Sequence, residues 1–326
     1  MTPLLNVVSS HHGVLLQDAG RRGAQAAGFC QAGALDLPSA WLAHGLVHGV
    51  WPAHDFVPTQ FYQLPPVIEI THGNCRFEAL TAITVAHVGA LGPLRVNQQP
   101  VTCGVTLSLK AGDVLEIGFY RQGLRGYLAI NADISAPRLY QSCSRVDREH
   151  VGLALTAGQQ LCGTPKQAAK TRSLPYVVQH ALLPPPVLQL DYLPQAASFE
   201  AAPEQAALEQ QLYRVSPQSN RMGVRCTGPS IWQHPRYSMR SEALSNGTIQ
   251  LPPDGQPLVL LNDHQTIGGY PRLGTLASYS IYALAQQRPG QFIRFNPVSL
   301  PELQIKRDQC WYWLWQQLAK ITGTTD

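Results

Sequence analysis

Short apolar runs, each closed by a glycine, proline, asparagine or aspartate, constrain this chain more than any other feature of its sequence. One set runs from Val67 to Ile130 and includes VIEI, CRFEAL, AITVAHVG, VTLSL and GYLAI; a second set after Leu212 includes LYRVSP, GVRCTGP, GTIQLP, LVLLN and FIRFNPVSL. Runs of this length between turn residues are typical of β-barrels and sandwiches. With 27 glycines and 26 prolines in 326 residues, little of the chain is left for helices. The sequence therefore predicts a mainly β protein with few helices.

Two helices and one turn stand out against this pattern. Asp36 can cap the free amides of a first helical turn, and apolar residues follow it at helical spacing up to Val47. At the other end, Trp311, Trp313, Leu314 and Leu318 recur at the spacing of a helix that buries one side. Ala111-Gly112-Asp113 predicts a turn between strands, because glycine tolerates positive φ and aspartate can bond its own backbone.

The length of the chain exceeds what one core usually holds, so two domains or subdomains are expected. The stretch 166–210 is poor in strand pattern and carries a proline triplet at 184–186. We predict an N-terminal β-barrel subdomain at 1–165, a linker or wrapping segment at 166–210, and a C-terminal β-barrel subdomain with a terminal helix at 211–326.

Charge and hydropathy argue against several classes of partner. The 24 Lys+Arg and 20 Asp+Glu give a diffuse formal charge of +4, without a basic run that would follow a nucleic-acid backbone. No window approaches the roughly 18 uninterrupted apolar residues of a membrane helix. The seven cysteines are odd in number, scattered and without a C-x-x-C pair, which favours reduced thiols. We expect a cytoplasmic protein with neither nucleic acid nor a membrane as partner.

Metal and cofactor signatures are weak or incomplete. His44 and His48 lie four residues apart on the predicted helix with His54 nearby, but no further ligand follows at a diagnostic spacing, so no metal is predicted. The glycines of 158–163 have P-loop spacing, yet Thr164-Pro165 replaces the required Lys-Ser/Thr pair. No methionine adjoins a lysine as in a biotinyl-lysine site, so no covalent biotin is expected on this chain.

A first candidate site is the turn within Ser216–Arg225. Ser219, Asn220, Arg221 and Arg225 place two guanidinium groups beside hydroxyl and amide donors. Such a set suits a carboxylate or phosphate, because arginine presents a planar fork to paired oxygens. The alternative is a β-turn whose arginines only cover the surface.

A second candidate site is the polar loop that runs from Asp263 to Pro271. Asp263 and His264 are candidate catalytic groups, because a carboxylate and an imidazole can exchange protons near neutral pH. The candidate binding residues are Gln265, Thr266, Gly268, Gly269 and Tyr270. The alternative is a tight hairpin in which Gly268 and Gly269 supply positive φ.

Five stretches in chain order carry a resemblance to a known family. They are LLQDAGRRGAQAAGFCQAGALD, IEITHGNCRFEALTAI, LKAGDVLEIGFYRQGLRGYLAI, YRVSPQSNRMGVRCTGP, and TIQLPPDGQPLVLLNDHQTIGGYPRLGTL with LAQQRPGQFIRF. Together they resemble the biotin-dependent carboxyltransferase family, which includes the C subunit of 5-oxoprolinase and the carboxyltransferase part of urea amidolyase. The resemblance is collinear from about Val14 to Val298. It implies a pair of cyclophilin-like β-barrel subdomains.

The resemblance also implies site residues. Positions that match the family's motifs include Asp18, Arg21 and Asp36 in the first loop, Ser219, Arg221 and Arg225 in the second motif, and Gln250, Asp263, Gln265, Thr266, Gly268, Gly269 and Tyr270 in the third. The chain departs from the family after Ile130, where Asn131-Ala132-Asp133 replaces the usual Gly-Gly pair and QSCSRVDREHVGLAL replaces a glycine-rich turn.

Three functions follow from the resemblance. The first is the C subunit of an ATP-dependent 5-oxoprolinase, which with subunits A and B opens 5-oxoproline to glutamate; the complex would use ATP, and the substrate is a small molecule. The second is a regulatory or binding partner of a kinase inhibitor that is similar to the B subunit. The third is a component of a biotin-dependent carboxyltransferase that takes its biotin from another protein.

Overall fold

The computed structural model describes residues 1–11, 13–49, 64–195, 202–232 and 240–322. The chain forms two compact units, which are described separately. Unit 1 comprises Met1–Arg21, Ala32–Leu183 and Tyr312–Asp326, and unit 2 comprises Arg22–Gln31 and Pro184–Trp311. One of the points at which the chain passes from one unit to the other, Leu183 to Pro184, falls inside the segment 166–210 that the sequence marks as a connection.

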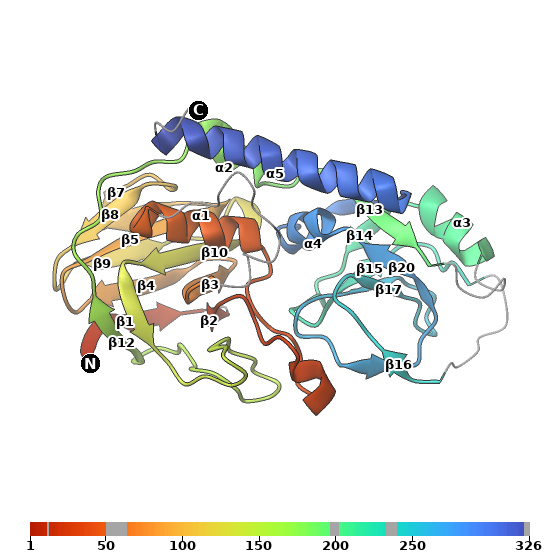
Figure 1. Ribbon diagram of the computed structural model, residues 1–326, viewed down its shortest axis with the longest axis horizontal. Coiled ribbons are helices and arrows are strands. Elements are labelled where there is room, and N and C mark those ends of the chain that lie inside the picture. Colours follow the sequence, from red (N-terminus) through yellow and green to blue (C-terminus); the bar gives the residue numbers. More distant parts are fainter. Residues whose placement is uncertain (12, 50–63, 196–201, 233–239, 323–326) are drawn as a thin grey trace. The chain divides into compact units, whose positions relative to one another are not determined.

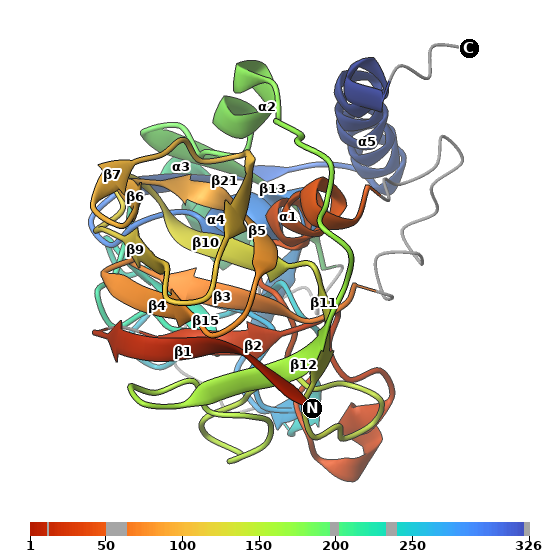
Figure 2. The same ribbon diagram turned by 90° about the vertical axis from the view of Figure 1, so that its left-hand side faces the viewer.

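Unit 1 contains two antiparallel sheets (Figures 1 and 2). The order of the seven-stranded sheet is β11 (Ala132–Ser135), β12 (Gln160–Pro165), β1 (Thr2–Ser10), β4 (Cys75–Ala79), β9 (Val114–Ile117), β6 (Leu94–Val96) and β7 (Gln99–Pro100). The order of the five-stranded sheet is β2 (Val14–Gln17), β3 (Val67–Thr71), β10 (Gln122–Ile130), β5 (Ile83–Leu91) and β8 (Thr106–Leu109).

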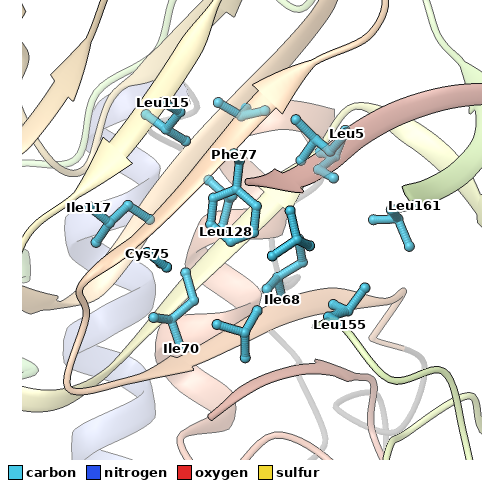
Figure 3. Close-up of a cluster of buried hydrophobic side chains, with 14 of the residues drawn as sticks. Leu5, Ile68, Ile70, Cys75, Phe77, Leu115, Ile117, Leu128, Leu155 and Leu161 are labelled. Atoms are coloured by element: carbon cyan, nitrogen blue, oxygen red, sulfur yellow. The ribbon is translucent and has the colours of Figure 1, made fainter. Parts of the chain in front are cut away.

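The core of unit 1 is built from the alternating residues of these strands. On β4 the side chains of Cys75, Phe77 and Ala79 are buried, whereas Arg76 is exposed and Glu78 half-buried. This period of two is what a strand with one buried face requires. Figure 3 shows Phe77 in the middle of the cluster, with aliphatic side chains from both sheets around it.

The predicted first helix is confirmed as α1 (Leu37–His48), which packs against β5 and β10. Asp36 is its N-cap and accepts hydrogen bonds from the backbone N–H of Ser39 at 3.2 Å and from its hydroxyl at 2.6 Å. Gly49 caps the end of the helix: its N–H donates to the carbonyl of Gly45 at 2.7 Å, and its φ of 69° turns the chain away from the helix axis. A short helix, α2 (Tyr176–Ala181), closes this unit.

Unit 2 is a closed seven-stranded barrel (Figure 1). Around the barrel the order is β13 (Val187–Pro194), β20 (Arg272–Leu276), β17 (Thr248–Gln250), β18 (Leu258–Leu260), β15 (Gly223–Thr227), β14 (Tyr213–Val215) and β21 (Phe292–Pro297). A separate ribbon pairs β16 (Glu242–Ala243) with β19 (Ile267–Gly268). The remaining elements are η1 (Ala24–Ala27), α3 (Ala202–Gln210) and α4 (Ser278–Ala285), and α5 (Leu300–Thr322) begins in this unit.

Asp191 on β13 ties the helices of unit 2 to the barrel. Its Oδ2 accepts from the Tyr279 hydroxyl and the Lys306 ammonium, both at 2.9 Å, and its Oδ1 accepts from the Asn296 amide at 2.7 Å. Burial raises the pKa of this carboxyl, but these hydrogen bonds together lower it below its usual range. The carboxylate therefore joins α4, α5 and β21.

The mainly β class predicted from the sequence is confirmed, as is the turn at Gly112, where φ is 88° and the Lys110 N–H donates to Asp113 at 2.7 Å. Three elements were not anticipated within 166–210: the short helix α2, the barrel strand β13, which lies between prolines, and α3. All seven cysteines are free thiols. Across the described ranges, no helix combines the length and apolarity that crossing a membrane demands.

Candidate functional site

The loop from Asp263 to Pro271 leaves β18 and returns into β20 in unit 2. Its backbone is held at both ends: the Asp263 N–H donates to the Arg221 carbonyl at 3.1 Å, and the Pro271 carbonyl accepts from the Leu251 N–H at 2.9 Å. Between these points β19 pairs with β16, with Gly268 opposite Glu242. The loop is therefore an ordered part of the unit.

Arg221 and Asp263 form a two-point ion pair that joins the two candidate motifs. The guanidinium Nε donates to Oδ2 at 2.8 Å and Nη2 donates to Oδ1 at 2.9 Å, with side chains 12% and 8% exposed. This fork-to-fork geometry is the strongest arrangement that arginine makes with a carboxylate. Because this edge of the guanidinium already holds Asp263, the edge is not open to a substrate carboxylate.

Asp263 and His264, the two candidate catalytic groups, engage different partners. The carboxylate faces Arg221, whereas Nδ1 of the fully buried His264 lies 2.5 Å from the carbonyl oxygen of Gln265. Since a carbonyl can only accept, Nδ1 is the donor in this contact. Proton transfer by either group remains a prediction.

Gly268 and Gly269 do not have the positive φ of a tight hairpin turn, so that interpretation of the double glycine is wrong. A side chain at Gly268 would instead crowd its neighbours. A Cβ there would lie 2.7 Å from Leu244 Cδ1, 3.1 Å from Gln250 Nε2 and 3.5 Å from Gln265 Nε2. Three side chains, two of them carboxamides, therefore converge on this glycine.

Gln250, at the end of β17, is fully buried beside Gly268. Neither its Oε1 nor its Nε2 has a hydrogen-bond partner among the residues that the structure describes. Buried carboxamides without partners are rare, because each unmet group costs about 1–3 kcal/mol of desolvation. Gln250 thus differs from the nearby Arg221 and Asp263, whose side chains bond to each other.

Ser219 and Asn220 serve the hairpin between β14 and β15. The Ser219 hydroxyl accepts from the Arg225 N–H at 3.1 Å, and the Asn220 side chain accepts from the Met222 N–H at 2.8 Å. The side chain of Arg225 on β15 is exposed, and it makes no ion pair with any described residue. The segment is thus the turn that the alternative interpretation predicted, and it also presents the exposed guanidinium of Arg225.

The remaining loop residues lie closer to solvent. The side chains of Gln265 and Thr266 are half-buried, and those of Ile267 and Tyr270 are 59% and 44% exposed. The Thr266 carbonyl accepts from the Leu244 N–H at 3.0 Å, which holds the ribbon closed.

The first-loop residues are structural anchors within unit 1. Asp18 Oδ1 accepts from the hydroxyls of Ser142 and Ser144, each at 2.6 Å, and Oδ2 accepts from the Cys143 N–H at 2.8 Å. Arg21 is fully buried, and its Nη2 donates to the Ser144 carbonyl. These bonds connect the family-like first loop to the QSCS segment, where the sequence departs from the family.

A second buried network holds the end of the same loop. The Tyr127 hydroxyl donates to Glu69 Oε2 at 2.8 Å and accepts from the Asp36 N–H at 2.8 Å. Glu69 also accepts from the Leu35 N–H at 3.0 Å. Burial, followed by the charges of Glu69 and Asp36, raises the Tyr127 pKa well above its usual value and keeps the hydroxyl protonated.

Sequence reasoning missed Ser142, Ser144 and Glu69. The alternating serines lie in a segment that was noted only for its departure from the family. A glutamate in a strand is expected to face solvent, but Glu69 is fully buried. A polar residue in the run VIEI, which otherwise reads as buried, was the available signal.

Other expectations can be placed as well. The rings of His44 and His48 stack with centroids 4.1 Å apart, and burial lowers the pKa of His44 to about 3. His54 lies outside the described residues. Gly158 occupies a turn that leads into strand β12 rather than a helix, which excludes a phosphate-binding P-loop. Within the described ranges, no group of three or more His, Cys, Asp or Glu could hold a metal ion.

Relatives of known name cover nearly the whole chain. It is 32% identical to the C subunit of 5-oxoprolinase from Escherichia coli (strain K12) over 321 residues, which is 97% of this chain and 98% of the relative. It is 26% identical to the C subunit of 5-oxoprolinase from Haemophilus influenzae over 92% of this chain and 93% of the relative. The urea amidolyase of Lachancea kluyveri is 25% identical over 89% of this chain but only 17% of its own length.

Solved structures agree on the fold. The crystal structure of TTHA0988 superposes with a TM-score of 0.78 at 28% identity over 90% of this chain, and the chain spans 56% of that longer protein. The Kluyveromyces lactis urea amidolyase gives a TM-score of 0.80 at 20% identity over 96% of this chain and 20% of its own. The family model described as carboxyltransferase domain, subdomain A and B, matches residues 27–297. The chain therefore belongs to the carboxyltransferase-domain family that also contains the 5-oxoprolinase C subunits.

Proposed function

We propose that this chain is the C subunit of an ATP-dependent 5-oxoprolinase, acting with subunits A and B to open 5-oxoproline to L-glutamate. The observation that carries the proposal is the match to the C subunit of the Escherichia coli 5-oxoprolinase, which extends over 97% of this chain and 98% of the relative. The urea amidolyase relation, by contrast, covers only a small part of a much larger chain. The near-complete match therefore favours the lactam-opening function.

The reaction adds water across the C–N bond of a lactam, so the carbonyl carbon gains an oxygen and the nitrogen gains a proton. Amide resonance makes this bond resistant, and ATP hydrolysis within the complex supplies the driving force. Within that reaction we assign this chain the role of holding the substrate. The groups suited to that role are in unit 2: the loop from Asp263 to Tyr270, Gln250, and Arg225.

The test is reconstitution of the purified three-subunit mixture. We expect ATP hydrolysis that depends on 5-oxoproline and yields L-glutamate in equal amount, and that disappears when this chain is omitted. If the three subunits form a complex that shows no 5-oxoproline-dependent ATP hydrolysis, the proposal is contradicted. Complex formation with the B subunit alone, without turnover, points to the regulatory role instead.

A second candidate is transfer of a carboxyl group from biotin carried by another protein, favoured by the family model that matches residues 27–297. This activity needs a biotin carrier and a biotin carboxylase in trans. Carboxylation of an acceptor by the chain supplied with carboxybiotin, in the absence of subunits A and B, distinguishes it from the lactam-opening activity.

A further inference from the structure

The starting point is the orphaned carboxamide of Gln250. Exchanging its oxygen and nitrogen, the usual ambiguity of a glutamine, does not satisfy it, because neither atom has a partner among the described residues. A methionine of the same length would fill the same space without the desolvation cost. A buried amide with one free donor edge and one free acceptor therefore calls for a ligand with the complementary pair.

The register of the barrel places Gln250 in a row with two other side chains. Gln250 on β17 is paired with Leu258 on β18, and Leu258 is paired with Arg225 on β15. Paired residues of neighbouring strands point to the same face of a sheet, so all three share one face. The row runs from a buried carboxamide, past the half-buried Leu258, to the exposed guanidinium of Arg225.

The dimensions of this row suit one small molecule. Neighbouring strands lie about 4.8 Å apart, so the backbones of Gln250 and Arg225 are separated by about 10 Å. A five-membered ring with one carboxylate is small enough to reach both a carboxamide and a guanidinium that are placed at this separation. Leu258, in the middle, offers an apolar contact for ring methylene groups.

The chemistry of a lactam matches the carboxamide edge. In a lactam the ring holds the N–H and the C=O on the same side, whereas an ordinary trans peptide directs them to opposite sides. A primary carboxamide also presents an N–H and a C=O on one edge. The two edges therefore pair by two hydrogen bonds, N–H to oxygen in each direction.

We propose that Gln250 reads the lactam edge of the substrate by this paired hydrogen bond, while Arg225 binds its carboxylate; the assignment rests on the 5-oxoprolinase function proposed above. Arg225 takes this role rather than Arg221, whose Nε and Nη2 already hold Asp263. Selectivity for a cyclic, cis amide over open-chain peptides then originates in Gln250.

Access to Gln250 requires the ribbon of β16 and β19 to move away from it. Gly268 lies against the carboxamide. The ribbon is held by its two paired positions, Glu242 with Gly268 and Ala243 with Ile267. An ion pair between Arg272 and Glu242 and a hydrogen bond from the Leu244 N–H to the Thr266 carbonyl add to them. So few bonds, several of them near solvent, make local opening inexpensive relative to unfolding. Gln265, which also approaches Gly268, moves with this segment.

The experiment compares Gln250→Met, Arg225→Met and the control Gln287→Met in the three-subunit complex. Gln287 is another buried glutamine of unit 2, but its amide N–H donates to the Phe292 carbonyl at 2.9 Å, and only its Oε1 has no partner among the described residues. For each variant we measure KM for 5-oxoproline, equilibrium binding of labelled 5-oxoproline, inhibition by 2-pyrrolidone, and the urea midpoint. The oxygen analogue of 5-oxoproline, a lactone acid without the N–H, serves as a further competitor.

For Gln250→Met we expect KM for 5-oxoproline to rise about 10- to 100-fold through the loss of two hydrogen bonds, with a urea midpoint that is unchanged or higher. This variant also loses the preference for lactam over lactone and the inhibition by 2-pyrrolidone. Arg225→Met weakens 5-oxoproline by a similar factor but leaves inhibition by 2-pyrrolidone unchanged, because that molecule has no carboxylate. Gln287→Met lowers the urea midpoint and leaves KM unchanged.

An unchanged KM and lactam preference in Gln250→Met, in a complex that turns over, overturns the inference while the proposed function stands. If the wild-type complex binds 5-oxoproline without hydrolysing it, the proposed function fails, and the binding of the Gln250→Met variant alone decides the inference. If the wild type neither binds nor hydrolyses 5-oxoproline, both are overturned.

Discussion

The guanidinium of Arg221 and the carboxylate of Asp263 meet edge to edge, with Nε 2.8 Å from Oδ2 and Nη2 2.9 Å from Oδ1. The Asp263 N–H also donates to the Arg221 carbonyl at 3.1 Å. One residue pair thus fastens the loop after β18 to the turn before β15 through both side chains and backbone.

We expect Asp263→Ala to lower the free energy of unfolding by about 3 kcal/mol, because it leaves a mostly buried guanidinium without its counter-charge. Arg221→Ala should have a cost of similar size for the same reason. The double variant should cost less than the sum of the two, since it leaves no uncompensated charge. Urea denaturation of the four proteins of this cycle measures the coupling, and strictly additive losses would contradict a direct pair.

Gly33 and Gly28 offer a matched test of why the first loop is rich in glycine. Both have left-handed backbones, with φ of 95° and 85°. A Cβ on Gly33 would lie 2.8 Å from Gly20 N and 2.9 Å from Ala19 C, whereas one on Gly28 meets nothing within 4 Å. Gly28→Ala should therefore cost only about 1 kcal/mol of backbone strain, and Gly33→Ala about 3 kcal/mol or more.

Thermal unfolding of the two variants checks this difference. The backbone atoms beside Gly33 cannot move away as a flexible side chain could. The larger loss of stability in Gly33→Ala should therefore persist when the nearby side chain of Leu35 is shortened in the double variant with Leu35→Ala. Equal losses for the two glycines would show that φ alone, and not close approach, selects glycine at position 33.

The sequence predicted the parts of this fold that depend on local chemistry. The cap at Asp36, the turn at Gly112 and the short strands were all readable, because each follows from propensity and punctuation over a few residues. The strand β13 was not, since prolines on both sides obscured its alternation. The sheet order, with β1 between β12 and β4, depends on contacts between segments that lie far apart in the chain.

The site shows the same division. Asp263 and Gln265 were recognised as polar residues in a glycine-rich loop, but nothing local shows that Arg221 would occupy the carboxylate. The role of Gly268 was also misjudged. A double glycine suggests a turn conformation, whereas in the structure a side chain at position 268 would crowd Gln250. Such a requirement arises from a residue on another strand and has no local signature.

We expect the protein to lose stability when Asp18 loses its charge or when a group that donates a hydrogen bond to Asp18 is removed. In Asp18→Asn the NH2 group replaces either Oδ1, which accepts from the Gly20 N–H, or Oδ2, which accepts from the Cys143 N–H, so in either orientation a donor faces a backbone donor. We expect a loss of about 2–3 kcal/mol in the free energy of unfolding. Ser142→Ala should cost about 1 kcal/mol, because Asp18 keeps its other donors. A urea midpoint for Asp18→Asn as high as that of the wild type would contradict this account of the cluster.

The buried histidines of unit 1 should make the protein sensitive to acid. Burial lowers the pKa of His87 from 6.5 to about 4, and burial, followed by His48 and Lys166, lowers that of His44 from 6.5 to about 3. Since both folded-state values lie below the unfolded value, the unfolded chain takes up more protons as the pH falls below 6.5. Stability from these two groups is therefore complete above about pH 7 and declines toward pH 4, by about 1.4 kcal/mol per pH unit for each histidine.

Urea midpoints between pH 7.5 and 5 measure this slope. His87→Gln should reduce the slope by the contribution of the one proton that His87 takes up on unfolding, and His44→Gln should reduce it by the contribution of a second proton. Tyr120→Phe is the control, because it removes the hydroxyl that lies 2.9 Å from His87 Nε2 but leaves the imidazole buried. It should lower stability at every pH without changing the slope. If His87→Gln and His44→Gln both had the same pH dependence as the wild type, the acid sensitivity would have to originate elsewhere in the protein.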